Sequence, residues 1–312
     1  MHSLCGLCVF VFKIAFVIIE SVPNFSEGRQ PEVCEALAAA ARARGVTVLD
    51  LTMDADHHRS VLTFAGHPRE VEAAAFDVAL RAVERIDLTK HSGNHPRMGA
   101  IDVLPFVPLQ GATMADAVAL ARVVGARIGS ELGLPVFLYE SAATRPERRN
   151  LADIRAPQFE GLREAIGVDP ARVPDFGPNR IHPTAGCVAV GARQPLIAFN
   201  VDLDTEDVAI AKKIARRIRE RDGGLPGIKA LGLPLPARKC AQVSINVCDY
   251  TRTGLLDVFR AVEKEASALG AGVRAGELIG LVPRAAFPED GARVLKLIEF
   301  DAGRILETRI PQ

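Results

Sequence analysis

The pattern of hydrophobic and polar positions predicts alternating strands and helices along the first 140 residues. Short apolar and β-branched runs bounded by turn residues are typical of strands, whereas apolar positions three and four apart are typical of helices. In the longest helical pattern, Val71, Ala75, Val78 and Ala82 fall on one face. The expected strands are residues 16–22, 46–53, 59–66, 101–109 and 135–140, and the expected helices are residues 31–44, 68–86 and 114–132.

A loop-rich segment, residues 143–186, follows these elements. Proline and glycine interrupt it repeatedly, and we expect one short helix near residues 159–166. The pattern then becomes regular again, although after residue 284 it does not distinguish a helix from short strands. The later expected strands are residues 195–203, 227–235, 241–250 and 275–283, and the later expected helices are residues 205–221 and 253–270.

Both halves of the chain show the order strand, helix, strand, strand, helix, strand, which is that of a ferredoxin-like unit. We therefore predict an α/β (α+β) fold with two ferredoxin-like βαββαβ-type subdomains. Each would have a mixed sheet, and a ligand cleft would lie between them. The predicted parts are a hydrophobic leader (residues 1–15), an N-terminal subdomain (residues 16–193) and a C-terminal subdomain (residues 194–312).

Composition and charge narrow the class of partner. Of the 312 residues, 48% are hydrophobic, which is enough to build sizeable cores. Lys plus Arg and Asp plus Glu both number 38, so no net charge attracts nucleic acid or an anionic membrane, and local arginines must hold any anionic ligand. The six cysteines are scattered and predict reduced thiols, and the CxxC of Cys5 and Cys8 has no second pair with which to complete a zinc site.

The apolar start of the chain does not have the pattern of a signal peptide. No basic segment precedes the apolar run, Lys13 interrupts it, and no small-residue cleavage site follows. The run is also too short to cross a bilayer. We therefore predict a cytoplasmic protein without a membrane partner, carrying a poorly defined leader.

The loop HSGNHPRMGA, residues 91–100, places unusual groups at the entrance of a strand. His91 and His95 are four residues apart, the spacing of a helical metal site, but Gly93 and Pro96 disfavour a continuous helix. A loop that presents His95, with Arg97 beside it, remains. Because imidazole exchanges a proton near neutral pH, His95 is a candidate general acid/base, with a structural loop histidine as the alternative.

The segment DADHHRS, residues 54–60, carries carboxylates, imidazoles and an arginine between two expected strands. Such a cluster is typical of a solvated hairpin turn, although it can also ligate a divalent metal. Without a separate ligand motif we predict no metal. Arg59 is a candidate for binding a carboxylate, because guanidinium groups do so in bidentate fashion.

Two further segments are candidates for ligand contact. In AQVSINVCDY, residues 241–250, Gln242, Ser244 and Asn246 alternate with apolar residues, so that one face of the strand carries amides and a hydroxyl. That face is either an ordinary solvated surface or a set of neutral partners for a heterocycle. PDFGPNRIHPTAG, residues 174–186, combines turn residues with Arg180 and His182 and fits either a connector or a ligand-binding loop.

Taken together, the motifs closely resemble the glutamate formimidoyltransferase family. The resemblance extends over residues 17–283, with the motifs in order and at compatible spacing. The segments that carry it include ESVPNFSEGR, DADHHRSVLTFAG, IDLTKHSGNHPRMGAIDVLPFVPL, PVFLYESAA, PDFGPNRIHPTAG, GARQPLIAFNVDL, AQVSINVCDYTRTGL and GELIGLVP.

The resemblance implies transfer of a formimidoyl group from N-formimidoyl-L-glutamate to N5 of the co-substrate tetrahydrofolate, by a homodimer. His95 matches the family's catalytic acid/base, and Arg59 and Arg97 are candidates for binding the substrate carboxylates. The folate-binding stretch of the family matches Gly177, Pro178, Asn179, Arg180, Ile181, His182, Pro183, Thr184, Ala185 and Gly186.

Three alternatives remain open from sequence. A folate-dependent formyl-group salvage enzyme would carry the same motifs. A folate-binding module without turnover is a second alternative, because ferredoxin-like folds support many binding functions. A metal-dependent hydrolase is the third, and it would use Asp54, Asp56, His57, His58 and His95.

Overall fold

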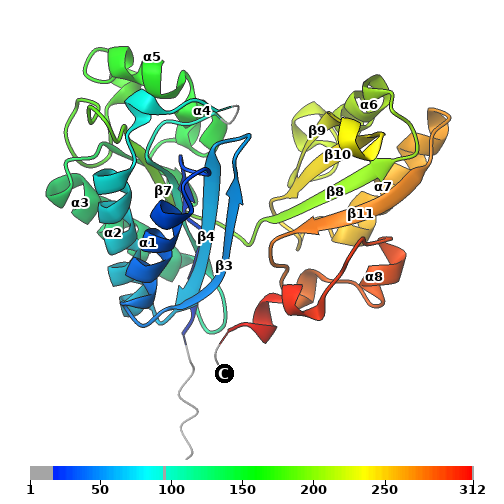
Figure 1. Cartoon of the computed structure of the whole chain (residues 1–312), viewed down its shortest axis with the longest axis horizontal. Coiled ribbons are helices and arrows are strands. Elements are labelled where there is room, and N and C mark those ends of the chain that lie inside the picture. Colours follow the sequence, from blue (N-terminus) through cyan, green and yellow to red (C-terminus); the bar gives the residue numbers. More distant parts are fainter. Residues whose placement is uncertain (1–16, 94–95, 311–312) are drawn as a thin grey trace, which may run out of the picture.

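The computed structural model describes residues 17–93 and 96–310. It contains two α/β subdomains, each built on its own β-sheet (Figure 1). In the N-terminal subdomain the strands are β1 (Ile19–Ser21), β2 (Asn24–Phe25), β3 (Thr47–Asp54), β4 (Arg59–Gly66), β5 (Ile101–Pro108), β6 (Val136–Glu140) and β7 (Val188–Ala192). Its α-helices are α1 (Pro31–Arg42), α2 (Pro68–Arg85), α3 (Met114–Glu131), α4 (Leu151–Arg155) and α5 (Gln158–Ala165), and the 3-10 helix η1 (Leu88–Lys90) precedes β5.

The N-terminal sheet contains a ferredoxin-like unit with two added strands. β1 and β2 lie between β4 and β5 and pair antiparallel with both, while β3 forms the outer strand beside β4. On the other side of β5, β7 and then β6 continue the sheet in parallel. Because β2 ends where β4 and β5 begin, three strand ends and their loops meet at one edge of this sheet.

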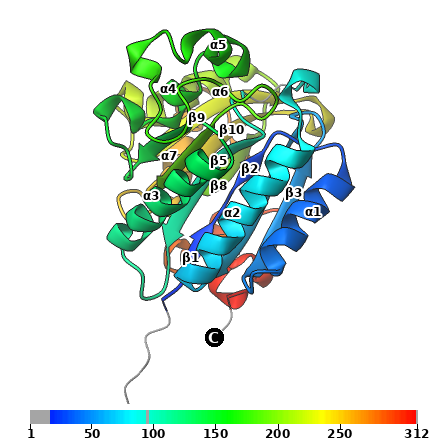
Figure 2. The ribbon, with the colours of Figure 1, turned by 90° about the vertical axis from the view of Figure 1, so that its left-hand side faces the viewer.

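Helices α1, α2 and α3 cover one face of the N-terminal sheet (Figure 2). Their small residues allow close packing on fully buried strand side chains such as Phe64, Leu104 and Phe106. Each of these large side chains contributes roughly 1.5–3 kcal/mol through burial. The helix α3 begins at a capping box in which Thr113 and Asp116 satisfy each other's backbone N–H groups.

The opposite face of the sheet is partly covered by the segment that contains α4 and α5. Ile154 and Leu162 from this segment pack on Val103, Phe137 and Tyr139 of the sheet. The irregular chain between β6 and β7 therefore forms a second, smaller core layer and brings its polar residues to the loop that precedes β5.

The C-terminal subdomain is a complete ferredoxin-like unit. Its elements are β8 (Ile197–Leu203), α6 (Val208–Ile218), β9 (Ile228–Leu235), β10 (Cys240–Val247), α7 (Leu255–Ala268), β11 (Val273–Ile279) and the short helix α8 (Gly291–Val294). The strand order is β11-β8-β10-β9, and every neighbouring pair is antiparallel. Apolar side chains of α6 and α7 bury one face of this sheet.

The end of the described chain returns to the N-terminal sheet (Figure 1). Leu306 packs with Ile18, Leu49 and Ala65, and Nη1 of Arg309 donates to the carbonyl oxygen of Leu49 at 2.8 Å. The two subdomains are thus joined by this segment as well as by the chain between β7 and β8.

The predicted fold class is confirmed, with corrections to its details. The C-terminal sheet is antiparallel and not mixed. The helix α6 connects β8 to β9, which run in the same direction, and α7 connects β10 to β11, which run in the opposite direction. The order β11-β8-β10-β9 alternates these two directions. The strands β2 and β7 and the helix α4 were not predicted. The boundaries set at residues 15 and 193 stay predictions, and the whole of the predicted leader, residues 1–15, lies outside the described residues.

The described cysteines are free thiols. Cys34, Cys187 and Cys240 are buried, and Cys248 is half-buried. Burial raises the pKa of each of these thiols, which makes them poor nucleophiles at neutral pH. Cys5 and Cys8 lie outside the described residues.

Candidate functional site

The loop between η1 and β5 lies at the sheet edge where β2 ends and β4 and β5 begin. Pairing of Phe25 with both Ser60 and Ile101 brings these strand ends together. The predicted acid/base residue, His95, lies outside the described residues, so its role stays a prediction. The described residues on both sides of it define the surroundings of the loop.

Gly93 packs directly against the turn between β3 and β4. A Cβ atom at this position would lie 2.6 Å from the carbonyl oxygen of His57 and 2.7 Å from Cβ of His58. Neither approach is compatible with a side chain unless the turn moves, so the close contact requires glycine.

His91 is held on both sides of its ring. Its Nε2 lies 2.9 Å from the carbonyl oxygen of His58, and its Nδ1 lies 3.0 Å from Nε of Arg97. The ring also stacks on that of His58, with centroids 4.2 Å apart and planes 7° from parallel. Burial lowers the pKa of His91, and the nearby charges of the His58 ring and Arg97 lower it further. The hydrogen bond to the His58 backbone carbonyl acts in the opposite direction, but the pKa remains below its ordinary value.

Glu27 and His58 form a buried pair beneath the loop. Oε1 of Glu27 lies 3.2 Å from Nε2 of His58, and Nδ1 of His58 lies 3.0 Å from the carbonyl oxygen of Ser92. The Glu27 carboxylate also accepts hydrogen bonds from the backbone N–H groups of Arg29 and Gln30 and from the Gln30 side chain. Burial alone would raise the pKa of Glu27, but these hydrogen bonds and His58 together lower it below its ordinary value.

Arg97 pairs with Glu160 of α5. Nη1 and Nη2 of Arg97 donate to the two carboxylate oxygens of Glu160 at 2.9 and 2.6 Å. The hydrogen bond from Arg97 holds the pKa of Glu160 below its ordinary value. Contact of Arg97 with a substrate stays a prediction, and in the structure its guanidinium is engaged by Glu160 and His91.

Arg59 and Arg155 lie beside Asp102, close to the start of β5. Nε and Nη2 of Arg155 donate to Oδ2 of Asp102 at 2.9 and 2.5 Å, while the backbone N–H of Met98 donates to Oδ1 at 2.8 Å. Arg59 donates to the side-chain oxygen of Asn24. Burial and the nearby charge of Arg155 lower the pKa of Arg59, whereas Asp102 opposes them. Arg59, Arg155 and Asp102 together carry a net positive charge, which suits an anionic ligand.

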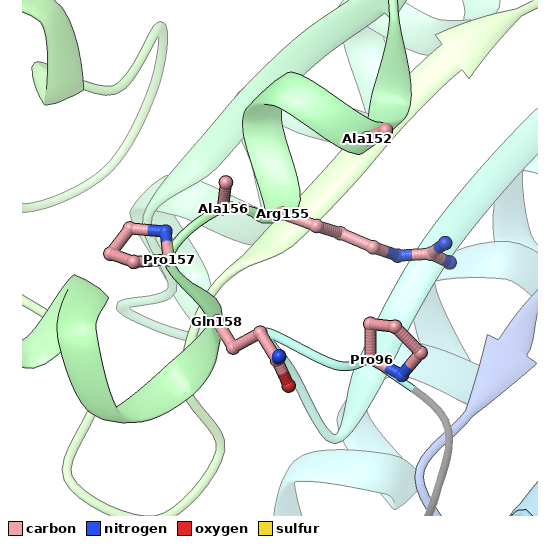
Figure 3. A pocket seen from close by; sticks show the side chains of 6 residues that line it. All are labelled: Pro96, Ala152, Arg155, Ala156, Pro157 and Gln158. Carbon is pink, nitrogen blue, oxygen red and sulfur yellow. The ribbon is translucent and has the colours of Figure 1, made fainter.

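A cavity of about 260 Å³ opens next to this cluster (Figure 3). Arg155 and Gln158 extend along it, and Pro96, the residue after His95, forms part of its wall. The loop predicted to carry the acid/base group therefore borders a cavity with an arginine. The lining residues are Pro96, Ala152, Arg155, Ala156, Pro157 and Gln158.

The predicted folate-binding stretch, residues 177–186, lines a second cavity of about 500 Å³. Arg180 is exposed at this cavity, whereas Nδ1 of His182 accepts hydrogen bonds from the backbone N–H groups of Thr184 and Ala185 at 3.4 and 3.0 Å. Burial lowers the pKa of His182, consistent with a neutral ring that shapes its own turn. The lining residues are Gly133, Pro178, Arg180, Ile181, His182 and Pro183.

The polar face predicted for residues 241–250 is present on β10. Gln242 is buried and donates to Oδ1 of Asp202 at 2.8 Å, and Arg238 pairs with Asp202 and Glu277. This part of the face is internally paired. Ser244 lies farther along the same face, opposite Asn200 of β8.

The segment DADHHRS forms the turn between β3 and β4. His57 is exposed and pairs with Asp54, while His58 points to Glu27 and His91. Within residues 17–93 and 96–310, no group of three or more His, Cys, Asp or Glu side chains could hold a metal ion. None of the helices in these residues combines the length and apolar character needed to cross a membrane.

The fold and the site define a two-subdomain α/β protein in which histidine, arginine and carboxylate side chains converge on loops at one sheet edge. The family model for the formiminotransferase domain, N-terminal subdomain, matches residues 18–193, and that for the formiminotransferase domain matches residues 198–296. The chain belongs to the formiminotransferase family, and the resemblance found in its motifs is confirmed.

Three relatives support this assignment, and two of them are similar to the chain in length. The chain is 46% identical to the glutamate formimidoyltransferase of Streptococcus pyogenes serotype M1, covering 94% of the chain and 98% of the relative. It is 43% identical to the glutamate formimidoyltransferase of Thermoplasma acidophilum, with 94% and 97% covered. The formimidoyltransferase-cyclodeaminase of Dictyostelium discoideum is 40% identical over 85% of the chain, which spans about half the length of that relative (50%).

Proposed function

We propose that the chain is a glutamate formimidoyltransferase, which transfers the formimidoyl group from N-formimidoyl-L-glutamate to N5 of tetrahydrofolate and releases L-glutamate. The observation that carries the proposal is the 46% identity to a glutamate formimidoyltransferase along nearly the whole of both chains. We further propose that the enzyme works as a homodimer, as the family resemblance implies, and that it is cytoplasmic, as the scattered cysteines of the sequence indicate.

The reaction requires a group that both accepts and donates a proton. Attack of N5 on the amidine carbon forms a carbon–nitrogen bond and a tetrahedral intermediate, and N5 loses its proton. The bond to the glutamate nitrogen then breaks, and this nitrogen takes up a proton as it leaves. An imidazole near neutral pH performs both transfers, which is the role proposed for His95.

Binding of the anionic donor is assigned to the arginines at the sheet edge. Guanidinium groups hold carboxylates through paired, charge-assisted hydrogen bonds. Arg59 and Arg155 supply an excess of positive charge beside Asp102, next to the cavity bordered by Pro96. Arg97 remains a candidate, although binding a substrate would require it to share its contacts with Glu160.

Residues 177–186 are proposed to bind tetrahydrofolate. The cavity that they line, about 500 Å³, falls within the usual range for small-molecule sites, about 300–1,000 Å³. Apolar groups from Pro178, Ile181 and Pro183 and the guanidinium of Arg180 suit a ligand that combines a ring system with an anionic tail.

The test is a turnover assay with tetrahydrofolate and N-formimidoyl-L-glutamate, following the product after its cyclisation to the absorbing methenyl form. We expect turnover by the wild type and a loss of about 100- to 10,000-fold in kcat for His95→Ala, the usual contribution of a general acid/base. Equal losses of kcat and folate affinity would contradict the assignment of His95. Turnover with N-formyl-L-glutamate and not with N-formimidoyl-L-glutamate would show that the transferred group is formyl. Binding of folate without any turnover would favour the folate-binding module instead of the enzyme.

A further inference from the structure

We propose that His58 and His91 form a clamp that positions the two described sides of the loop before β5, residues 91–93 and 96–97, with His58 in its protonated form and His91 in its neutral form. The inference rests on the proposed function, because this loop carries His95. The two rings are assigned as positioning residues, because their hydrogen bonds go to groups of the loop and of the adjacent turn.

The form of His91 follows from its two hydrogen-bond partners. A guanidinium donates hydrogen bonds and cannot accept them, so Nδ1 of His91, 3.0 Å from Nε of Arg97, must be the acceptor. A backbone carbonyl oxygen accepts, so Nε2, 2.9 Å from the carbonyl oxygen of His58, must carry the proton. The neutral Nε2–H tautomer satisfies both contacts.

The form of His58 follows in the same way. Its Nδ1 must donate to the carbonyl oxygen of Ser92, because that oxygen accepts. Its Nε2 faces a Glu27 carboxylate that accepts hydrogen bonds from Arg29 and Gln30 and is thereby kept ionised. Both nitrogens therefore donate, which is possible for the imidazolium form alone.

The stacked arrangement is compatible with one charge and not with two. A proton added to Nδ1 of His91 would remove the acceptor of Arg97 and place two imidazolium rings 4.2 Å apart. The charged groups that face the rings are Glu27 from the β2–α1 loop, Arg97 from the loop itself and, beyond it, Glu160 of α5. Asp54 and His57, on the same turn as His58, pair with each other.

The clamp contacts the loop on both sides of His95. His91 and the carbonyl oxygen of Ser92 are held before it, and Arg97 is held after it. A reacting group misplaced by about 1 Å loses on the order of 100-fold in rate, so holding both sides of the loop matters for catalysis.

The first test is His91→Phe, which keeps an aromatic ring over His58 and removes both hydrogen bonds. We expect kcat to fall about 10- to 100-fold, with the KM of each substrate nearly unchanged. The matched control is His57→Phe, the same change in the neighbouring exposed ring, which should retain wild-type kcat. His91→Gln keeps a hydrogen-bond donor near the position of Nε2, and His91→Asn keeps an acceptor near the position of Nδ1. Each variant should therefore have a higher kcat than His91→Phe.

The second test reads the rings without any substrate, by ¹⁵N NMR of the histidine side chains in the full-length protein at neutral pH. We expect His91 as the neutral Nε2–H tautomer and His58 protonated on both nitrogens.

The outcomes separate the clamp from the proposed function. Wild-type kcat in His91→Phe, or a singly protonated His58 ring, would overturn the clamp. Equal losses in the Phe, Gln and Asn variants together with a lowered Tm would indicate a purely structural role and would also overturn it. A wild-type protein with the expected ring states but no turnover would instead contradict the proposed function.

Discussion

At the scale of single residues, Gly93 tests whether the turn between β3 and β4 sets the position of the loop. Its missing side chain lets the backbone approach His57 and His58 more closely than any Cβ atom permits. We expect Gly93→Ala to push the loop from the turn, to lower the free energy of unfolding by about 1–3 kcal/mol and to reduce kcat. Urea unfolding and steady-state kinetics measure the two effects.

Ser92→Ala is the matched control for Gly93→Ala, because the Ser92 side chain is exposed and its carbonyl oxygen, which His58 binds, is retained. A Gly93→Ala protein with the stability and kcat of Ser92→Ala would contradict the close contact. The histidines of the site, Arg59 and Arg97 were predictable from their residue types, whereas Arg155 was not, because its partner Asp102 lies 53 positions away along the chain. Glu27 and Glu160 were not predictable either, since their partners lie 31 and 63 positions away along the chain.

At the scale of elements, α5 is tied to the loop before β5 through two adjacent residues. Glu160 pairs with the Arg97 side chain, and the backbone N–H of Phe159 donates to the Arg97 carbonyl oxygen at 3.0 Å. Because the Glu160 side chain is 65% exposed, we expect Glu160→Gln to change the free energy of unfolding by less than about 1 kcal/mol. The loosened Arg97 should nevertheless lower kcat, and hydrogen exchange of the Phe159 amide should become faster.

Glu164→Gln, the same change at an exposed position of α5, provides the comparison and should leave kcat and exchange at Phe159 unchanged. If the two variants behaved alike, α5 would not contribute to holding the loop.

The position of the helix α5 was partly predictable from the sequence, because its apolar residues have helical spacing. The strand β7 was not, since Val, Ala and Gly in a run of five residues give little periodic signal, and its pairing with β5 and β6 is decided by tertiary structure.

At the scale of the whole molecule, Glu20 lies where the N-terminal sheet, the connection between the subdomains and the end of the described chain meet. It is buried on β1, between Ala65 of β4 and Val107 of β5. Burial raises the pKa of Glu20 from 4.5 to about 7, with Glu307 adding to the shift and Arg193 opposing it. The sequence showed this glutamate within an apolar strand but could not show that later segments of the chain would cover it.

This buried carboxyl predicts a pH dependence of stability. In the folded protein Glu20 keeps its proton to about pH 7, whereas in the unfolded chain it loses it near pH 4.5, so the folded state binds more protons between these values. The contribution of Glu20 to the free energy of unfolding therefore falls as pH rises through this window, by on the order of 3 kcal/mol. Glu20→Gln, which cannot ionise, should gain stability relative to the wild type as the pH rises from 5 to 8, as measured by urea unfolding.

The control is Glu206→Gln, at an exposed position, which should stay within about 0.5 kcal/mol of the wild type at both pH values. A constant difference between Glu20→Gln and the wild type across this range would contradict the burial of the Glu20 carboxyl group in the folded protein.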